Sequence, residues 1–351
     1  MRKSFTTGTI RSWSRRGPLA GLVALTFFAA ACGGGGGGGG AAPPGGGAPA
    51  AEDVPQDAIS VTANTQQNPL PAGTPGVGKP AVIIGSKNFS EQTLLGELCS
   101  QALRAKGYTV NLKASIGGSE LIDTSLQSNQ VQMYPEYLGE IVTSVAKQPA
   151  PTSASDTYQK AKAFEESKRG STLLLQTPFE DTDTIAVNNQ VAQQYGLQTV
   201  ADLAKIGPGG QGVTIAGPTE FSTRDTGLLG VKAQYNLPSV GYLSVQSGTQ
   251  YQALDQNAAN AANAFSTDYQ LTSGKYTVLA DPKGVFGYQY VAPVVKQEVL
   301  AAQGPEFAAT LNWVSSLLST KAIQALNQQV QGNGANPASV AQQFLAANGL
   351  K

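Results

Sequence analysis

The sequence of 351 residues contains no histidine. General bases and metal sites that depend on an imidazole ring are therefore excluded, together with any serine–histidine catalytic arrangement. The chain has two cysteines, Cys32 and Cys99, and we expect no disulfide because Cys32 has another role, described next. Basic and acidic residues number 23 each, so the net charge is zero. A zero net charge gives no electrostatic footprint for nucleic acid, and we expect no such partner.

The N-terminus has the pattern of an export signal. A basic start is followed by an apolar run from Pro18 to Ala31, which ends at Cys32. This run is too short for a stable membrane-spanning helix and is typical of a signal peptide. We therefore expect residues 1–31 to be a lipoprotein signal peptide and Cys32 to be lipidated, which would anchor the protein to the outer face of the cytoplasmic membrane. An ordinary secretory signal with an incidental cysteine is the alternative.

The segment after Cys32 is dominated by Gly, Ala and Pro as far as residue 80, and begins with eight consecutive glycines. Such a composition buries too little apolar surface to offset the entropy of ordering. We therefore expect residues 32–80 to form a lipidated, disordered tether. The remaining residues 81–351 are long enough for two lobes with cores of their own.

Strand and helix patterns alternate through this body. Helices are expected from Ser90 to Gly107, after a capping Ser119, and through most of 305–350, and apolar strand patterns occupy 81–84, 108–112, 131–134, 185–187, 213–216 and 262–265. Cys99 lies on the apolar stripe of the first helix, so we expect it to be a core residue. The alternation favours an α/β fold with parallel sheets, in which ligands bind at the carboxyl ends of the strands.

Polar, glycine-bearing or aromatic turns follow several of the apolar runs. In chain order, the sequences Gly-Ser-Lys-Asn-Phe-Ser-Glu-Gln, Ile-Gly-Gly-Ser and Tyr-Pro-Glu-Tyr-Leu-Gly occur at 85–92, 116–119 and 134–139. Together they resemble the substrate-binding lipoproteins of glycine betaine/carnitine/choline (osmoprotectant) ABC importers, the OpuAC-like family. The resemblance continues through 216–224, 265–268 and 326–327, and it covers essentially all of residues 81–351.

The resemblance implies a type II periplasmic-binding fold, with two α/β lobes joined by two crossover strands and the ligand in the interlobe cleft. On this analogy lobe 1 comprises residues 81–183 and 285–351, and lobe 2 comprises 184–284. It also implies an extracytoplasmic receptor, monomeric and not an enzyme, that delivers its ligand by lobe closure to a permease driven by an ATPase. We expect no cofactor and no metal.

Members of this family hold a quaternary ammonium in a cage of aromatic rings, because a methylated cation has no N–H to donate. The resemblance places Tyr137 and Phe265 in such a cage, and Lys87 and Arg224 at the ligand carboxylate. The complete set of expected ligand contacts is Lys87, Asn88, Ser119, Tyr134, Tyr137, Glu140, Asp183, Arg224, Phe265, Gln289 and Tyr290.

Three positions depart from the family pattern. Glu140 stands where a hydroxyl residue is common, and Asp183 and Gln289 stand where cage tyrosines are common. Since two unit charges 4 Å apart interact by about 4 kcal/mol at an effective dielectric constant of 20, two carboxylates in the cleft would oppose a betaine carboxylate. We therefore expect a choline-like cation to be preferred over glycine betaine. If Glu140 pairs with Lys87 or Arg224, or faces solvent, a zwitterion still binds.

Other functions stay open at this stage. The chain could bind another polar amine or zwitterion, or act as a ligand sensor for a signalling partner, because the fold alone does not decide which partner reads the ligand-bound state. A structural or adhesive surface lipoprotein is a further alternative. An enzyme with Cys99 as nucleophile is disfavoured by the position of Cys99 on an apolar stripe and by the lack of histidine.

Overall fold

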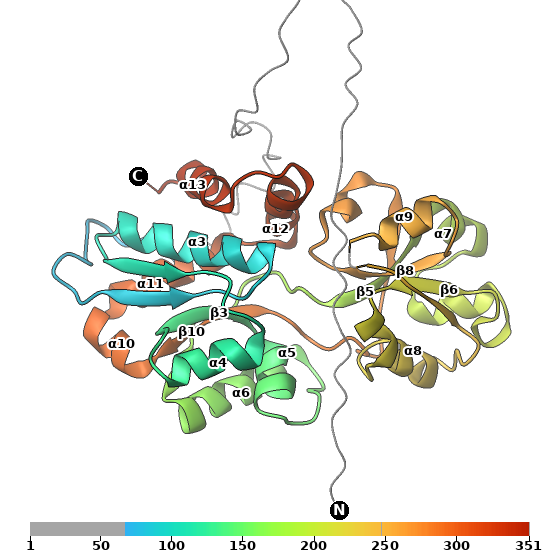
Figure 1. The fold of residues 1–351 in the computed structure, drawn as a ribbon, viewed down its shortest axis with the longest axis horizontal. Helices are drawn as coiled ribbons and strands as arrows, with labels where there is room; N and C mark the ends of the chain where they lie inside the picture. The colour runs from blue at the N-terminus through green and yellow to red at the C-terminus, as the bar shows by residue number, and fades with distance from the viewer. Residues whose placement is uncertain (1–66, 247, 351) are drawn as a thin grey trace, which may run out of the picture. The chain divides into compact units, whose positions relative to one another are not determined.

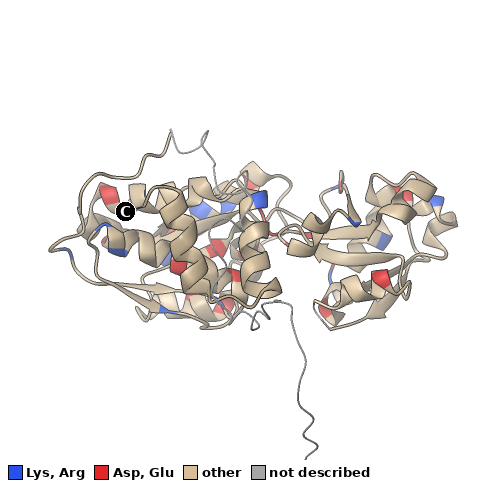
Figure 2. Cartoon of the chain, turned by 90° about the horizontal axis from the view of Figure 1, so that it is seen from above, with Lys and Arg blue, Asp and Glu red and all other residues tan. Residues whose placement is uncertain are grey.

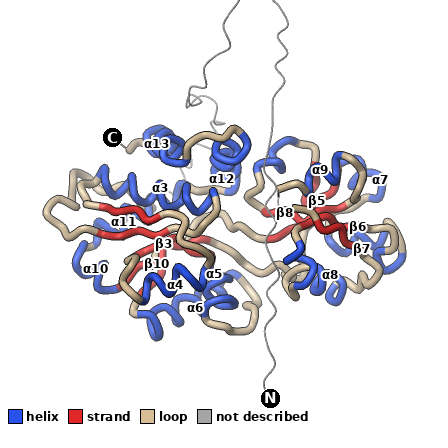
Figure 3. Tube along the Cα trace, viewed as in Figure 1, coloured by secondary structure: helices blue, strands red, loops and turns tan. Residues whose placement is uncertain are grey.

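The computed structural model describes residues 67–246 and 248–350. The predicted signal peptide, Cys32 and the tether as far as residue 66 lie outside these residues. The described part folds around two five-stranded sheets, each flanked by helices (Figures 1 and 3). Basic and acidic positions are interspersed over the ribbon (Figure 2). Among the described helices, none has the length and apolarity needed to cross a membrane.

The first sheet has the strand order β2-β1-β3-β10-β4. Its strands are β1 (Val82–Gly85), β2 (Val110–Lys113), β3 (Met133–Tyr137), β4 (Ser171–Leu173) and β10 (Val291–Lys296). β1 pairs in parallel with β2 and β3, whereas β10 is antiparallel to both β3 and β4. The sheet is therefore mixed, with parallel pairing, which the strand–helix alternation favoured, confined to β2, β1 and β3. The reason is that β10 enters the sheet as the chain returns from the second lobe.

Helices cover both faces of this sheet, which together with them forms lobe 1. They are α3 (Ser90–Ala105), α4 (Ser119–Gln127), α5 (Leu138–Glu140), η2 (Ile141–Val145), α6 (Ala154–Phe164), η3 (Glu165–Arg169), α10 (Gln297–Gln303), α11 (Pro305–Leu317), α12 (Thr320–Asn327), η8 (Gln328–Gly332) and α13 (Pro337–Ala347). Successive side chains of β3 point to opposite faces of the sheet. Met133 and Tyr137 join the core beneath α3 and α11, and Tyr134 joins the core beneath α4 and α6.

The second sheet, with the order β7-β6-β8-β5-β9, forms lobe 2. Its strands are β5 (Asp183–Asn188), β6 (Thr214–Gly217), β7 (Gly241–Ser244), β8 (Ala261–Phe265) and β9 (Tyr276–Leu279). Its helices are α7 (Asn189–Tyr195), η4 (Val200–Lys205), η5 (Pro208–Gly210), η6 (Thr219–Thr223), α8 (Leu228–Gln234), α9 (Gln250–Asp255) and η7 (Tyr269–Ser273). This sheet is also mixed, since β5 is antiparallel to β8 and β9 while β6 is parallel to β7 and β8.

Two crossover segments join the lobes, one between β4 and β5 and one between β9 and β10. They meet at an antiparallel bridge between Glu180 and Tyr290. The backbone N–H of Asp181 donates to the carbonyl of Gln289 over 3.1 Å. Val285 and Phe286 pack in the core of lobe 2, so the second crossover leaves that core a few residues later than the predicted boundary.

Two local expectations differ from the structure. Ser119 does not cap α4, because Gly118 occupies the N-cap without a side-chain bond and the Ser119 hydroxyl instead accepts from Lys87. The last part of the predicted tether packs on lobe 1. There Leu70 lies against the core, and the Gly76 N–H donates to the Lys106 carbonyl over 2.9 Å.

Candidate functional site

A pocket of about 730 Å³ is lined by residues of both lobes. Its size is in the usual range for small-molecule sites. The lining includes aromatic rings from both lobes, which are Phe89, Tyr137, Phe265, Phe286 and Tyr288. It also includes six carboxyl side chains, Glu91, Glu120, Glu140, Asp181, Asp183 and Asp268, but only two basic ones, Lys87 and Arg224.

The strand ends explain why these side chains meet. Lys87 follows the carboxyl end of β1 and Tyr137 closes β3, its parallel neighbour. In lobe 2, Asp183 begins β5 opposite Phe265, the last residue of β8. Because β5 and β8 are antiparallel, the start of one and the end of the other lie at the same sheet edge.

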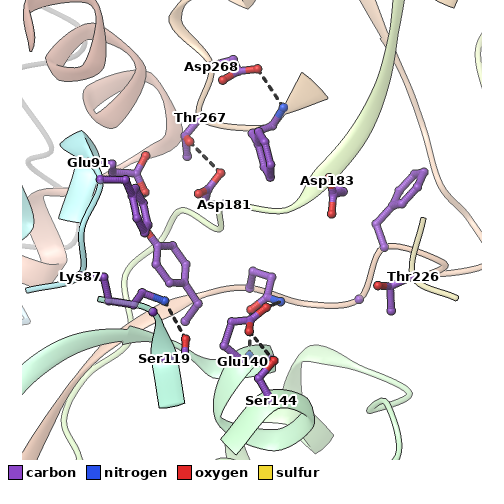
Figure 4. A pocket seen from close by; sticks show the side chains of 18 of the residues that line it. Lys87, Glu91, Ser119, Glu140, Ser144, Asp181, Asp183, Thr226, Thr267 and Asp268 are labelled. Atoms are coloured by element: carbon purple, nitrogen blue, oxygen red, sulfur yellow. Dashed lines mark hydrogen bonds between the residues drawn. The ribbon is translucent and has the colours of Figure 1, made fainter. Parts of the chain in front are cut away.

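The Lys87 ammonium group contacts a carboxylate, a hydroxyl group and an aromatic ring of the protein. Its Nζ lies 2.5 Å from Glu136 Oε1 and 3.0 Å from Ser119 Oγ, and the Lys87 and Glu136 side chains are 5% and 0% exposed. The same ammonium lies 4.3 Å from the centroid of the Tyr137 ring. Figure 4 shows Lys87 turned to Ser119 at one end of the pocket. The positive charge of Lys87 is therefore already balanced by the Glu136 carboxyl group.

Glu91, in the first turn of α3, belongs to a hydrogen-bond network that reaches lobe 2 through Asn327. Its carboxyl group accepts from the Tyr137 hydroxyl over 2.8 Å and from Asn327 Nδ2 over 2.7 Å. Asn327 also donates to the carbonyl of Thr267 in lobe 2, and the Thr267 hydroxyl donates to Asp181 over 2.8 Å. Burial raises the pKa of Glu91 and raises that of Asp181 well above its usual range, where the nearby Glu91 charge adds to the effect.

Glu140 and Asp183 both line the pocket. Glu140 Oε2 accepts from Ser144 Oγ over 2.5 Å, as Figure 4 shows, and Asp183 Oδ1 accepts from Asn263 Nδ2 over 2.7 Å. In the described part of the chain, Glu140 makes no ion pair with Lys87 or Arg224. Burial raises the pKa of Asp183 to about 6, with bonding to Asn263 and the charge of Arg224 acting in the opposite direction.

The structure brings most of the expected ligand contacts to this pocket. Those that line it are Lys87, Ser119, Tyr137, Glu140, Asp183, Arg224, Phe265 and Gln289. Asn88, Tyr134 and Tyr290 do not line it. Asn88 is exposed elsewhere, Tyr134 is fully buried in mid-strand, and Tyr290 packs against the core beneath α4 and α6. The side-chain alternation of β3 sends Tyr134 into that core.

Sequence reasoning missed several lining residues. Glu91, Asp181 and Asp268 each lie within a few residues of a position that it selected, but their sequence context is that of an ordinary helix start or turn. Asn327 comes from the C-terminal helices, and no spacing in the sequence links it to Glu91 across more than 200 residues. Within the described residues, no cluster of acidic side chains has an arrangement that could hold a metal ion.

Two mixed α/β lobes, joined by two crossover segments and sharing a pocket, define a solute-binding protein with the type II periplasmic-binding fold. A solved structure titled "Crystal structure of glycine betaine/carnitine/choline ABC transporter" has this fold, with a TM-score of 0.70 and 24% identity over 77% of this chain and 99% of that one. Residues 80–347 match the family described as "Substrate binding domain of ABC-type glycine betaine transport system", and the chain belongs to this family.

Two relatives of this chain are named for different ligands. The "Glycine-betaine-binding protein" of Pseudomonas aeruginosa is 30% identical over 76% of this chain and 88% of its own length. The "Ergothioneine transport permease/ergothioneine binding protein EgtU" of Helicobacter pylori is 26% identical over 77% of this chain and 48% of its own length. The chain is thus a substrate-binding protein of the glycine betaine type of ABC importer.

Proposed function

We propose that this receptor prefers an organic cation without a carboxylate, such as choline, over glycine betaine. The observation that carries the proposal is the acidic lining of the pocket, which has six carboxyl groups and two basic side chains. Glu120 pairs with Lys147 and burial raises the pKa of Glu91 and Asp181, so Glu140 and Asp183 are the carboxyl groups that act on the ligand charge. Of the two bases, Lys87 is already paired with Glu136, which leaves Arg224 as the free basic partner for a ligand carboxylate among the described lining residues. These carboxyl groups stabilise a bound cation and repel a carboxylate on the ligand.

The aromatic rings supply the complementary contact. Phe89 and Tyr137 stack with their centroids 6.0 Å apart, and Phe265, Phe286 and Tyr288 belong to the same lining. Ring faces attract a methylated cation that cannot donate a hydrogen bond. We include all the lining members of the predicted set in the proposed ligand contacts, and we omit Asn88, Tyr134 and Tyr290.

A zwitterion is the second candidate. The exposed Arg224 side chain lines the pocket, and one relative is named for glycine betaine and another for ergothioneine. Arg224 would hold the carboxylate of such a ligand. Charge balance favours the first candidate, because Glu140 and Asp183 would then lie near the same carboxylate.

The test is calorimetric titration of the purified chain with choline, glycine betaine, carnitine and ergothioneine at one salt concentration. We expect choline to bind more tightly than glycine betaine. In Glu140→Thr the ratio of the two dissociation constants should shift toward glycine betaine by at least about tenfold, because a unit charge near the ligand is removed. An unchanged ratio in that variant would refute the cation preference, and binding of glycine betaine alone would establish the zwitterion.

The cellular role follows from the family and the N-terminal sequence. We propose that the protein is exported, anchored through a lipidated Cys32 and monomeric, and that it works outside the cytoplasmic membrane. Ligand contacts in both lobes would favour the closed form, which a permease and its ATPase then recognise. Metabolic labelling with a fatty acid in the wild type and in Cys32→Ala tests the anchor, and loss of label in the variant is the expected result.

A further inference from the structure

The side chain of Gln289 contacts Glu140 from the second crossover segment. Gln289 Oε1 accepts from the backbone N–H of Glu140 over 3.2 Å, and Gln289 Nε2 lies 3.5 Å from Glu140 Oε1. The orientation of the amide is determined by these partners. If it were reversed, the NH₂ group would face an N–H donor and the oxygen would face a carboxylate, and both contacts would be repulsive.

The contact is close because Gly139 leaves room for it. A Cβ atom at position 139 would lie 2.7 Å from Gln289 Oε1 and 2.8 Å from Nε2. Any other residue at 139 would displace the amide from the backbone of α5. The close approach of the Gln289 amide to α5 therefore depends on glycine at position 139.

The backbone of Gln289 is fixed as well. Its carbonyl accepts from the Asp181 N–H in the other crossover segment over 3.1 Å. The next carbonyl, that of Tyr290, accepts from the N–H of Leu138 at the start of α5 over 2.9 Å. Gln289 thus connects both crossover segments, where the lobes are joined, to the turn that carries Glu140.

The Glu140 carboxylate receives donors from two directions. Ser144 Oγ, one turn later, donates to Oε2, and Gln289 Nε2 faces Oε1. These contacts restrict the rotamers of a long side chain whose carboxylate lines the pocket. Rotamer restriction before binding lowers the entropy that the ligand complex must lose.

We propose that Gln289 is a positioning residue that holds the Glu140 carboxylate at the ligand. The preference for a cation over a zwitterion would then depend on a residue of the second crossover segment. The proposal rests on the proposed function, in which Glu140 is a counter-ion of the bound cation. In this role Gln289 acts through Glu140. Ser144 supports the same carboxylate from the opposite side.

The test is a double-mutant cycle with Glu140→Gln, Gln289→Met and the double variant, in which the dissociation constants of choline and glycine betaine are measured by calorimetry. Methionine matches glutamine in length but makes neither hydrogen bond. We expect Gln289→Met to lower the choline preference by about tenfold, the size of a lost bond to a charged group. In the Glu140→Gln background the same change should leave the preference unaltered.

Two further variants distinguish a specific effect on Glu140 from a general effect on folding or on the contacts between the lobes. Ser144→Ala removes the other donor at a partly exposed site and should lower the choline preference in the same direction. Gln324→Met is the matched control, because Gln324 donates to the Ser266 carbonyl of lobe 2 over 2.8 Å but does not line the pocket. It should change both affinities by the same factor.

The outcomes separate the two proposals. If Gln289→Met changes both ligands equally, or changes the preference just as much when Glu140 is already glutamine, the positioning role is refuted while the cation preference stands. If Glu140→Gln leaves the preference unchanged, the cation preference and the role of Gln289 both fall.

Discussion

The Lys87 ammonium and the Glu136 carboxyl group form a buried ion pair, 2.5 Å apart, at the carboxyl ends of β1 and β3. Burial raises the pKa of Glu136, and the charge of Lys87 acts against this rise. We therefore expect the pair to stabilise lobe 1, in addition to placing Lys87 in the pocket lining.

Lys87→Met should lower the free energy of unfolding by about 3–5 kcal/mol, because it leaves the Glu136 carboxyl group buried without a counter-ion, with the Tyr137 N–H as its remaining donor. The double variant Lys87→Met/Glu136→Gln should regain much of the loss. Lys147→Met is the control, since Lys147 and Glu120 are 69% and 64% exposed and their pair contributes less than about 1 kcal/mol. Urea unfolding measures all four proteins. Lost affinity for glycine betaine at unchanged stability would show instead that Lys87 serves the ligand.

Affinity for choline should depend on pH through Asp183. Burial raises the pKa of Asp183 to about 6, so the carboxyl group is mostly neutral below that pH and charged above it. A bound cation favours the charged form and must displace the proton at lower pH. Choline affinity should therefore rise with pH between about 5 and 7, by at most about tenfold per unit for one displaced proton, and level off above.

Titrations at four pH values between 5 and 8 measure this dependence. Asp183→Asn should flatten the profile, whereas Asp255→Asn, outside the pocket lining, should leave it in place. In the absence of ligand, the contribution of Asp183 to folding stability should change with pH in the opposite direction. The folded state binds the Asp183 proton more tightly than the unfolded state, so this group lowers stability as pH rises from about 4 to 6. A wild-type choline affinity that stays constant between about pH 5 and 7 would contradict the binding prediction.

The Cys99 thiol should be unreactive in the folded protein. Cys99 is 5% exposed in the core under α3, and burial raises its pKa to about 12. The thiolate, which is the reactive form, is therefore scarce at neutral pH. In a chain that begins at residue 67, a thiol reagent should modify Cys99 only after unfolding in urea. Ser155→Cys adds an exposed thiol as a positive control, and rapid native modification of Cys99 would reopen the enzyme alternative.

Residues 67–80 should contribute to stability. Leu70 packs on the core of lobe 1, Gln303 Nε2 donates to the Pro80 carbonyl over 2.9 Å, and a Cβ at Gly76 would lie 2.3 Å from the Tyr108 nitrogen. A chain that begins at residue 81 should be less stable than one that begins at 67 by about 1–3 kcal/mol, from the lost apolar burial. Urea unfolding compares the two, and equal midpoints would show that the segment contributes nothing.

The local pattern of the sequence was sufficient for the main elements. The apolar run at 81–84 and the helix from Ser90 to Gly107 correspond to β1 and α3, because their periodicity reports burial directly. The pattern could not show that β10 is antiparallel to β3, since strand direction depends on the path of the chain between the lobes. It also missed the packing of Leu70, because a segment rich in Gly and Pro gives no periodic signal.

The sequence by itself determined the family and the expected fold, and it selected Glu140, Asp183 and Gln289 as departures from the family pattern. Only the tertiary structure decided what those residues contact. Lys87 pairs with Glu136, and Gln289 bonds to Glu140 across a separation of 149 residues. Such pairings depend on which strand ends and crossover segments meet in space. That juxtaposition is a property of the folded chain, and no local sequence pattern encodes it.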